Sequence, residues 1–338
     1  MSFLDPDNLY IEGGRNLPNG GFVRNEVMRL QDVAEYRKKH NNTGIYVTAY
    51  VYDTPEIESK EAKLYGDFYM DFDKENDLEK ARADALTAIW YMTRKFTYDI
   101  PVSFFRIYFS GYKGIHLVIP ATVFGVVADK NLNEYYKLMA MDVLERIPYK
   151  TLDTRIYDRR RLLRIVNSRH QKTGLYKIPL TYNELRNCSI EQIRMKATQM
   201  VNLKYETPYE IDRAKQEYKR FVKEWEERFQ KKFDNKKRFP SKPLPFTPAC
   251  IQELIDLGPQ IGCRNNTVSV LTSFWKRQGH TEQEIWDRLV AWNKGSLDEK
   301  ELRRTMQSIF HGEYEYGCST LSEMATCIGK ECPLYKER

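Results

Sequence analysis

The sequence predicts an α+β protein in which a mixed strand-and-helix domain precedes a small all-α domain. Strand-like runs and helical stretches alternate through the first half of the chain, an order that argues against a helix bundle. After about Asn187 the composition changes, and a long charged segment leads into a helical region that holds most of the cysteines. We therefore expect domains at 1–187 and 246–338, joined by a basic helical linker at 188–245.

In the first domain, the spacing of apolar residues marks each expected element. The clearest is a helix at 77–98, where apolar residues recur at helical spacing from Leu78 to Met92. A second helix is expected at 131–146 and a short one at 26–38. The expected strands lie at 44–52, 64–73, 103–109 and 116–119, with further strand-like pieces within 152–180.

The second half of the chain begins with a long charged helix, expected at 207–235. Between Arg213 and Lys242 there are twelve Lys or Arg residues against five Asp or Glu residues. This helix is therefore either a solvated surface element or a face for nucleic acid. Residues 238–245 contain three prolines, which is typical of a stiff linker. A helical domain follows the linker.

The composition narrows the classes of function. The chain has 338 residues, 41% of them hydrophobic, and its net charge of +7 suits a polyanionic partner. No apolar run approaches the roughly 18 residues that span a bilayer, and the N-terminus lacks a signal-peptide pattern. We expect an intracellular protein with no membrane partner, whose cysteines are reduced thiols or metal ligands.

Two acids, Asp71 and Asp73, lie in the aromatic run at 68–73. Because side chains at i and i+2 of a strand point to the same face, the two carboxylates project side by side. Burying them together is costly unless a positive group neutralises them. Mg²⁺ and Mn²⁺ prefer such oxygen ligands. The alternative is a strand edge whose acids face solvent.

The loop at 110–116, with the sequence S-G-Y-K-G-I-H, joins two expected strands soon after the acidic pair. Glycines such as Gly111 let a backbone approach phosphate oxygens closely. Ser110 can donate a hydrogen bond and Lys113 adds charge. His116 opens the next strand, where its imidazole could donate to a phosphate. The alternative is a glycine turn beside a packed histidine.

A basic segment follows Asp153. Six arginines lie between Arg155 and Arg169, more than the two local acids, Asp153 and Asp158, can neutralise. A triphosphate or a nucleic-acid backbone would satisfy them, and a solvated basic strand is the alternative. Asp153 could complete a three-carboxylate site for two metal ions, which suits nucleotidyl transfer. Asp158 is its rival; Asp153 is preferred because the apolar Leu152 precedes it and the arginines follow.

Three motifs in this order resemble those of the archaeo-eukaryotic primase (primase-polymerase) superfamily. They are D-x-D at 71–73, S-G-x-x-G-x-H at 110–116, and L-D at 152–153 followed by S-x-H-x-K-T-G at 168–174. The resemblance covers about residues 40–185. It implies a catalytic fold of mixed sheets flanked by helices, with an RNA-recognition-like half. It also implies template-dependent nucleotide joining with Mg²⁺ or Mn²⁺.

The resemblance also implies roles by position. Three carboxylates would hold the catalytic metal ions: Asp71, Asp73 and Asp153. A second set would hold the incoming triphosphate: Ser110, Gly111, Lys113, His116 and Lys172, with Arg164, Ser168 and His170 as further contacts. Tyr112 departs from the arginine often found at that place, so one phosphate contact is expected to be missing or supplied by Lys113.

Three cysteines cluster near the end of the chain: Cys318, Cys327 and Cys332. Such a cluster in an intracellular protein is typical of a metal site, and both tetrahedral zinc and iron–sulfur clusters need a fourth ligand. The segment from Pro248, with Cys250 at a helix start, resembles the iron–sulfur domain of the archaeo-eukaryotic primase large subunit. This resemblance implies Cys250 as the fourth ligand and favours a [4Fe–4S] cluster, with Zn²⁺ as the alternative because both use thiolates.

The stretch G-C-R-N-N at 262–266, continuing to 292–293, also resembles the primase C-terminal helical module of mobile-element replication proteins. Arg264 and Asn265 could contact DNA or the initiating nucleotide, and helix capping is the alternative. Cys263 occupies a variable position of the G-x-R-N pattern, so it is not taken as a metal ligand.

Together these expectations describe a DNA-dependent primase that also polymerises, using single-stranded DNA, nucleoside triphosphates and two metal ions. The sequence has no G-x-x-x-x-G-K-[ST] loop, so a separate replicative helicase is an expected partner. The expected location is cytoplasmic, at the nucleoid or replication site, and the compact layout is typical of a mobile element. The alternatives are a gap-filling repair polymerase, a non-enzymatic replication-origin DNA-binding protein and a three-carboxylate nuclease.

Overall fold

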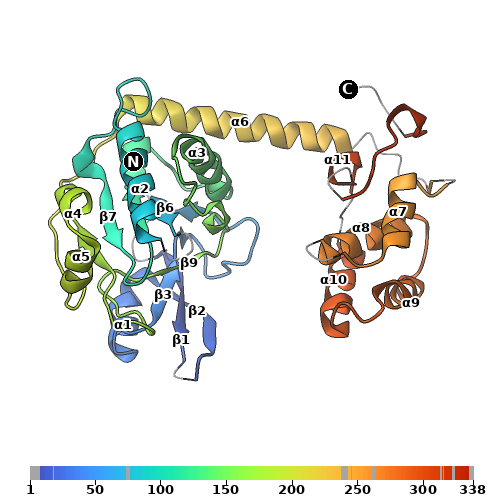
Figure 1. The fold of residues 1–338 in the computed structure, drawn as a ribbon, viewed down its shortest axis with the longest axis horizontal. Coiled ribbons are helices and arrows are strands. Elements are labelled where there is room, and N and C mark those ends of the chain that lie inside the picture. Colours follow the sequence, from blue (N-terminus) through green and yellow to red (C-terminus); the bar gives the residue numbers. More distant parts are fainter. Residues whose placement is uncertain are drawn as a thin grey trace. The chain divides into compact units, whose positions relative to one another are not determined.

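The chain forms two compact units, residues 1–228 and 229–338. In the described residues of this computed structural model, strands occur in the first unit and the second is helical, which confirms the predicted α+β class (Figure 1). The description covers residues 8–334 except Pro18, 74–76, 237–242, 245, 261–262, 313, 315 and 322–323.

The first sheet of unit 1 is six-stranded and antiparallel. Its order is β5-β4-β1-β3-β9, and β2 pairs with β1 outside this path. Helix α1 (Val33–Lys39) covers one face through Tyr36, which packs with Ile45 and Ile165. The strands are β1 (Tyr10–Asn16), β2 (Phe22–Arg29), β3 (Ile45–Thr48), β4 (Val51–Tyr52), β5 (Leu64–Tyr65) and β9 (Leu162–Arg164).

The helix expected at 26–38 was wrong in its first part, and β1 was not foreseen. Residues up to Arg29 belong to β2, and the α-helix begins only at Val33. In the β1–β2 hairpin Glu12 pairs with Val27 and Gly13 with Glu26. Cross-strand pairing gives these backbone groups hydrogen-bond partners, whereas a short isolated helix has little stability of its own.

The second sheet has four antiparallel strands in the order β10-β7-β8-β6. Along β6, Phe68, Met70 and Phe72 are fully buried, and Phe68 contacts Tyr136 of helix α3. Because strand side chains alternate, Asp71 points to the opposite face. The elements are β6 (Phe68–Phe72), α2 (Leu78–Met92), β7 (Arg106–Phe109), β8 (Ile115–Ile119), α3 (Leu132–Arg146) and β10 (Ile178–Leu180).

Residues 188–228 pack onto unit 1. Ile193, Ala214, Tyr218 and Phe221 belong to its main hydrophobic core. The unit therefore ends after Arg228 instead of at the expected residue 187, because apolar residues on these helices complete the core. Helix α4 (Tyr182–Asn187) directly precedes this region, whose own helices are α5 (Ile190–Lys196) and α6 (Asp212–Lys236).

The helices of unit 2 surround a separate core that includes Leu271, Trp275 and Leu289. Thr281 caps the start of α9 through a capping box, and Asp298 caps α10. Nowhere in the described ranges is a helix both long and apolar enough for a membrane span. The helices are α7 (Ala249–Leu257), α8 (Arg264–Arg277), α9 (Glu282–Asn293), α10 (Glu299–His311) and α11 (Cys318–Leu321).

Candidate active site

Backbone pairing brings the three predicted carboxylates to one edge of the second sheet. Asp71 lies in β6 and Asp73 follows it directly. The amide of Asp153 donates to the carbonyl of Asp71 at 2.9 Å, and the amide of Asp73 donates to the carbonyl of Thr151 at 3.1 Å. Segment 151–153 therefore runs along the edge of β6, and Asp153 lies beside the acidic pair.

The rival acid, Asp158, has a different setting. It is exposed, and its carboxylate accepts a hydrogen bond from the amide of Arg160 at 2.9 Å. The carboxylate of Asp153 accepts from the Arg155 side chain at 2.9 Å. Burial tends to raise the pKa of Asp153. The hydrogen bonds from the side chain and the amide of Arg155 outweigh burial, so the pKa is lowered. Asp153 is therefore ionised beside Asp71, and the paired geometry singles it out over Asp158.

The surroundings of Asp71 disfavour its ionised form. Burial, and then the neighbouring Asp73, raise the pKa of Asp71 to about 7. The Oδ1 atoms of both acids are buried and accept no hydrogen bond from the described residues. Two nitrogen atoms lie close to these oxygens: Lys113 Nζ is 3.0 Å from Asp73 Oδ1, and His116 Nε2 is 3.3 Å from Asp71 Oδ1.

The two buried Oδ1 atoms indicate whether a divalent cation would fit here. Mg²⁺ and Mn²⁺ bind carboxylate oxygens, and a buried oxygen without a hydrogen bond calls for a partner. The donor set of Asp71, Asp73 and Asp153 therefore fits such an ion. The three side chains are not gathered into ligand geometry: within the described ranges no group of three or more His, Cys, Asp or Glu residues is placed to hold a metal ion.

The glycine loop between β7 and β8 packs directly on the acids. Ser110 Oγ accepts a hydrogen bond from the Gly114 amide at 2.9 Å and closes the turn. A Cβ atom on Gly114 would lie 3.4 Å from Asp71 Oδ1 and only 3.0 Å from the Phe72 carbonyl oxygen. Gly111 has a φ of +83°, in the left-handed region that favours glycine. Glycine therefore lets this loop approach the acidic strand.

His116 faces Asp71 across the β6–β8 register. Burial, followed by the charges of Lys177 and Arg164, holds the pKa of His116 well below its usual range, so the imidazole is neutral. Its Nδ1 contacts the hydroxyl of Tyr69. With Tyr69 as the donor in this contact, Nε2 carries the ring proton and can donate it to an anionic oxygen.

The loop at 168–174 lies against the glycine loop. Thr173 Oγ1 donates to the Gly111 carbonyl at 2.7 Å. The ring of His170 lies 5.1 Å from the ring of Tyr112. The second and third predicted motifs therefore meet, and Tyr112, where the resemblance leads one to expect arginine, contributes an aromatic ring next to His170.

Other members of the third motif differ in what they contact. Burial, with the charges of Arg164 and Lys172, lowers the pKa of His170 to about 4. Lys172 is exposed. Ser168 is fully buried, and its hydroxyl donates to the Ile165 carbonyl at 2.7 Å. Ser168 thus contacts its own turn and points at no acid of the site.

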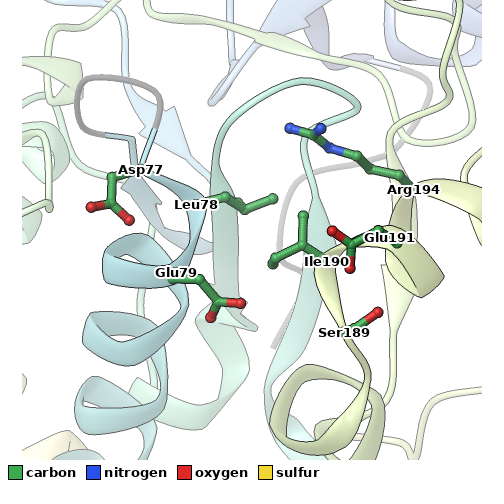
Figure 2. Close-up of a pocket in the computed structure, with 7 residues that line it drawn as sticks. All are labelled: Asp77, Leu78, Glu79, Ser189, Ile190, Glu191 and Arg194. Carbon is green, nitrogen blue, oxygen red and sulfur yellow. The ribbon is translucent and has the colours of Figure 1, made fainter.

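A separate pocket lies between the starts of α2 and α5 (Figure 2). Its volume is about 510 Å³. It contains none of the predicted site residues, and three of its seven lining residues are acids, which would repel a phosphate. The lining residues are Asp77, Leu78, Glu79, Ser189, Ile190, Glu191 and Arg194.

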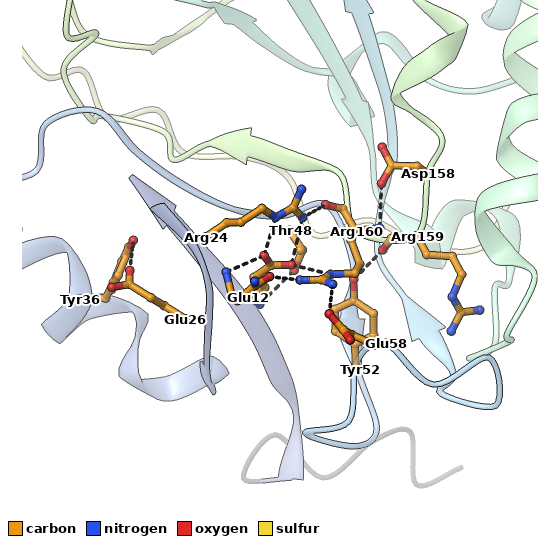
Figure 3. Close-up of polar contacts among 11 residues, drawn as sticks. Glu12, Arg24, Glu26, Tyr36, Thr48, Tyr52, Glu58, Asp158, Arg159 and Arg160 are labelled. Atoms are coloured by element: carbon orange, nitrogen blue, oxygen red, sulfur yellow. Dashed lines mark hydrogen bonds and ion pairs between the residues drawn. The ribbon is translucent and has the colours of Figure 1, made fainter. Parts of the chain in front are cut away.

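The arginine-rich segment has two uses. Arg160 pairs with Glu12 at 2.9 Å, and Glu12, which is fully buried, also pairs with Arg24 (Figure 3). Arg159 donates to backbone carbonyls at residues 59 and 62. Arg159 and Arg160 therefore stabilise the fold, and a distant acid, Glu12, supplies the neutralising charge that the local sequence lacks.

Arg161 and Arg164 act on the candidate site. The charge of Arg161 lowers the pKa of both Asp71 and Asp153. Arg164 lies in β9, and its charge lowers the pKa of His116. These two arginines therefore make the electrostatic environment of the candidate site more positive.

Lys177 was not identified from the sequence. It is 2% exposed, and its Nζ donates to the Arg164 carbonyl at 2.9 Å. Nζ also lies 5.2 Å from the ring centre of Tyr69 and 5.3 Å from that of Tyr108. Burial lowers the pKa of Lys177 to about 7, although Asp71 opposes this shift. Its apolar neighbours in the sequence were the only available signal of burial, since lysine usually faces solvent.

The predicted cysteine ligands lie partly together. Cys250 stands in the first turn of α7, where burial, then Cys318 and Cys332, raise the pKa of its thiol. The amide of Thr326 donates to Glu253 of the same helix at 2.7 Å, which brings the turn before Cys327 to α7. Thiol donors fit zinc or an iron–sulfur cluster. The described cysteines do not form a three-ligand group, so the metal stays a prediction.

Arg264 and Asn265 begin α8, whose cap residue is Cys263. Arg264 donates to the Ser296 carbonyl at 2.7 Å, and Asn265 donates to Glu301 at 2.7 Å. The alternative interpretation was that these residues cap the helix. Neither side chain does so. Both instead tie α8 to the region of α10.

Comparison with known proteins supports a primase-type function. Residues 253–315 match the family described as Primase C terminal 1 (PriCT-1), which confirms the predicted resemblance of this region. Among solved structures, one described as "Crystal structure of primase RepB'" is similar with a TM-score of 0.36 and 11% identity, over 94% of this chain and 92% of that one. No curated protein matches the chain.

Proposed function

We propose that the protein is a DNA-dependent primase, able also to extend primers, that joins nucleotides by two-metal nucleotidyl transfer. One observation carries the proposal: the Asp153 amide pairs with Asp71, so the three predicted carboxylates share a sheet edge. The glycine loop lies directly on that edge. The PriCT-1 match in the second unit supports the same function.

Asp71, Asp73 and Asp153 would hold Mg²⁺ or Mn²⁺, which would activate the attacking 3′-hydroxyl and stabilise the leaving pyrophosphate. The remaining groups would bind the triphosphate. Lys113 and Arg161 supply positive charge near the acids, Arg164 supplies it near His116, and Lys172 is an exposed lysine of the third motif. The neutral His116 would donate its Nε2 proton to a phosphate oxygen. Such preorganised donors and charges are the main resource of phosphoryl-transfer enzymes.

In this proposal the second unit holds the initiating nucleotide. A primase must bind a first nucleotide that is not part of a primer. We assign this role to the region that matches PriCT-1. We further propose that Cys250, Cys318, Cys327 and Cys332 bind a [4Fe–4S] cluster, with Zn²⁺ as the alternative. Arg264 and Asn265, tied to Ser296 and Glu301, would then act from a rigid surface.

The decisive experiment is primer synthesis on unprimed single-stranded DNA with labelled nucleotides and Mn²⁺ or Mg²⁺. The matched variants are Asp71→Ala with Asp73→Ala, and Asp158→Ala as a control acid outside the paired edge. We expect products from the wild type and the control and none from the double variant.

Three outcomes would support other functions. Growth of annealed primers alone would favour a repair polymerase. Tight, sequence-dependent duplex binding that survives loss of Asp71, without synthesis, would favour an origin-binding protein. Degradation of oligonucleotides in the absence of nucleotides would favour a nuclease.

A further inference from the structure

One face of the six-stranded sheet carries aromatic side chains. Gly14 pairs with Tyr46, and Tyr46 pairs with Arg164, across β1, β3 and β9. The ring of Phe22 lies 5.5 Å from that of Tyr46, edge to face. A Cβ atom on Gly14 would lie 3.0 Å from the Phe22 ring, so Gly14 makes room for it. Phe22, Tyr46 and Arg164 define what we call the open face.

The open face has no helix over it among the described residues. Helix α1 packs on the other side of the sheet, where Tyr36 lies near Gly13 and packs with Ile45. Phe22 is 46% exposed, Tyr46 is partly exposed, and both lie outside the described hydrophobic clusters. Phe22 and Tyr46 therefore form an aromatic pair that no described helix covers.

Arg164 connects the open face to the candidate active site. Its guanidinium lies 4.9 Å from the centre of the Tyr46 ring and donates to the Tyr46 hydroxyl at 2.9 Å. It also donates to Gln171 at 3.1 Å. The charge of the same arginine acts on His116. The Arg164 end of the open face is therefore the end near His116, which pairs with Asp71, and Phe22 lies at the other end.

Charge complementarity indicates the occupant. Glu12 lies on the same strand as Gly14, but Arg24 and Arg160 neutralise it (Figure 3). The face thus presents aromatic rings and arginine without an unpaired acid, on a chain of net charge +7. Exposed rings beside cations are how proteins bind single-stranded nucleic acid, with bases stacked on rings and phosphates near the cations.

We propose that the open face binds the single-stranded DNA template, with a base stacked on Phe22 and the strand passing over Tyr46 and Arg164 toward the acids. This inference rests on the proposed function, since it names the surface on which a primase of this kind would hold its template.

The test measures DNA binding apart from catalysis. A fluorescein-labelled single-stranded oligonucleotide is titrated with the full chain at fixed salt, without nucleotides or divalent ions, and anisotropy is followed. We expect Phe22→Ala to weaken binding about 5-fold or more, the value of one lost stacking contact. Phe22→Trp should retain binding. Phe96→Ala is the matched control, because Phe96 is 87% exposed in the same unit and outside the open face.

A second measurement covers the case in which a variant misfolds. Wild-type protein is photo-crosslinked to oligonucleotides that contain 4-thiothymidine, and the adducts are mapped by mass spectrometry. We expect adducts on the peptides of Phe22 or Tyr46 and none on that of Phe96.

Two results would overturn the inference while leaving the proposed function intact: equal DNA affinity of Phe22→Ala and wild type in a protein that makes primers, or crosslinks confined to other surfaces. An increase in the nucleotide KM of Phe22→Ala with unchanged DNA affinity would assign the face to the incoming base instead. Absence of primer synthesis by the wild type would refute the proposed function, whatever the crosslinks show.

Discussion

The amide of Asp153 donates to the carbonyl of Asp71 at 2.9 Å, so two acids that lie far apart in the sequence are neighbours at one sheet edge. This backbone hydrogen bond fixes the main chain of both residues side by side. Because of this, their side chains lie in the same region at the sheet edge in any rotamer. This relationship turns separate motifs into one candidate site, and the predictions below depend on the charges that it brings together.

Removing the charge of Asp71 should stabilise the metal-free protein at neutral pH. The folded-state pKa of Asp71 is about 7, above the ordinary 3.8, so folding is penalised once the acid ionises. Stability relative to Asp71→Asn should therefore fall as pH rises from about 4 to about 7 and level off above. At about 1.4 kcal/mol per pKa unit, and with the side chain 20% exposed, we expect a gap of about 2–4 kcal/mol at pH 8.

Urea unfolding in EDTA at pH 4 and pH 8 measures this gap. Adding Mn²⁺ should stabilise the wild type more than the variant, because a cation compensates the ionised pair. Equal stability of the two proteins at pH 8 in EDTA would contradict the prediction.

The charge of Lys177 should affect the pKa of Asp71 in the working enzyme. Its charge lowers the pKa of Asp71, so Lys177→Met should raise that pKa further and move the acid limb of the pH–rate profile for primer extension to higher pH. The profile is compared with that of Lys204→Met, which removes an exposed lysine. An unshifted limb in a folded Lys177→Met protein would show that Lys177 only supports the Arg164 backbone.

The ion pairs of Glu12 with Arg24 and Arg160 should contribute to the free energy of unfolding. Glu12 is fully buried and pairs with Arg24 and Arg160 (Figure 3). Glu12→Gln leaves Arg24 without its carboxylate partner and Arg160 with only the exposed Glu58, so we expect a loss of about 2–4 kcal/mol in the free energy of unfolding. Glu58 also pairs with Arg160, but its side chain is 74% exposed, and Glu58→Gln should cost less than about 1 kcal/mol. Similar losses for both variants in urea titrations would argue against this ranking.

Replacing Cys250 should impair the initiation of primers but not their extension. Cys250→Ser should reduce bound iron or zinc, measured by elemental analysis of anaerobically purified protein, because it removes a ligand. Synthesis on unprimed DNA should fall while extension of annealed primers persists. Cys188→Ser serves as the control, since Cys188 lies against the core of unit 1. Unchanged metal content in Cys250→Ser would exclude Cys250 as a ligand.

Local patterns gave good predictions where one periodicity dominates. The helices expected at 77–98 and 131–146 correspond to α2 and α3, and the strand at 116–119 to β8. The region before residue 30 failed because β1 contains two glycines and β2 carries charged residues, so neither has a clear strand pattern. There the long-range pairing of the hairpin overrides local propensity.

The sequence by itself determined which chemical groups are present: the D-x-D pair, the glycine loop, the third acid and the terminal cysteines. Their types and spacing follow from short-range rules of strand and turn geometry. The sequence also favoured Asp153 over Asp158. Only the tertiary structure showed that the Asp153 amide pairs with Asp71, that Glu12 forms an ion pair with Arg160, and that the buried Lys177 acts electrostatically on Asp71. These facts depend on strand register and burial, which arise from contacts between residues distant in the chain and leave no local pattern.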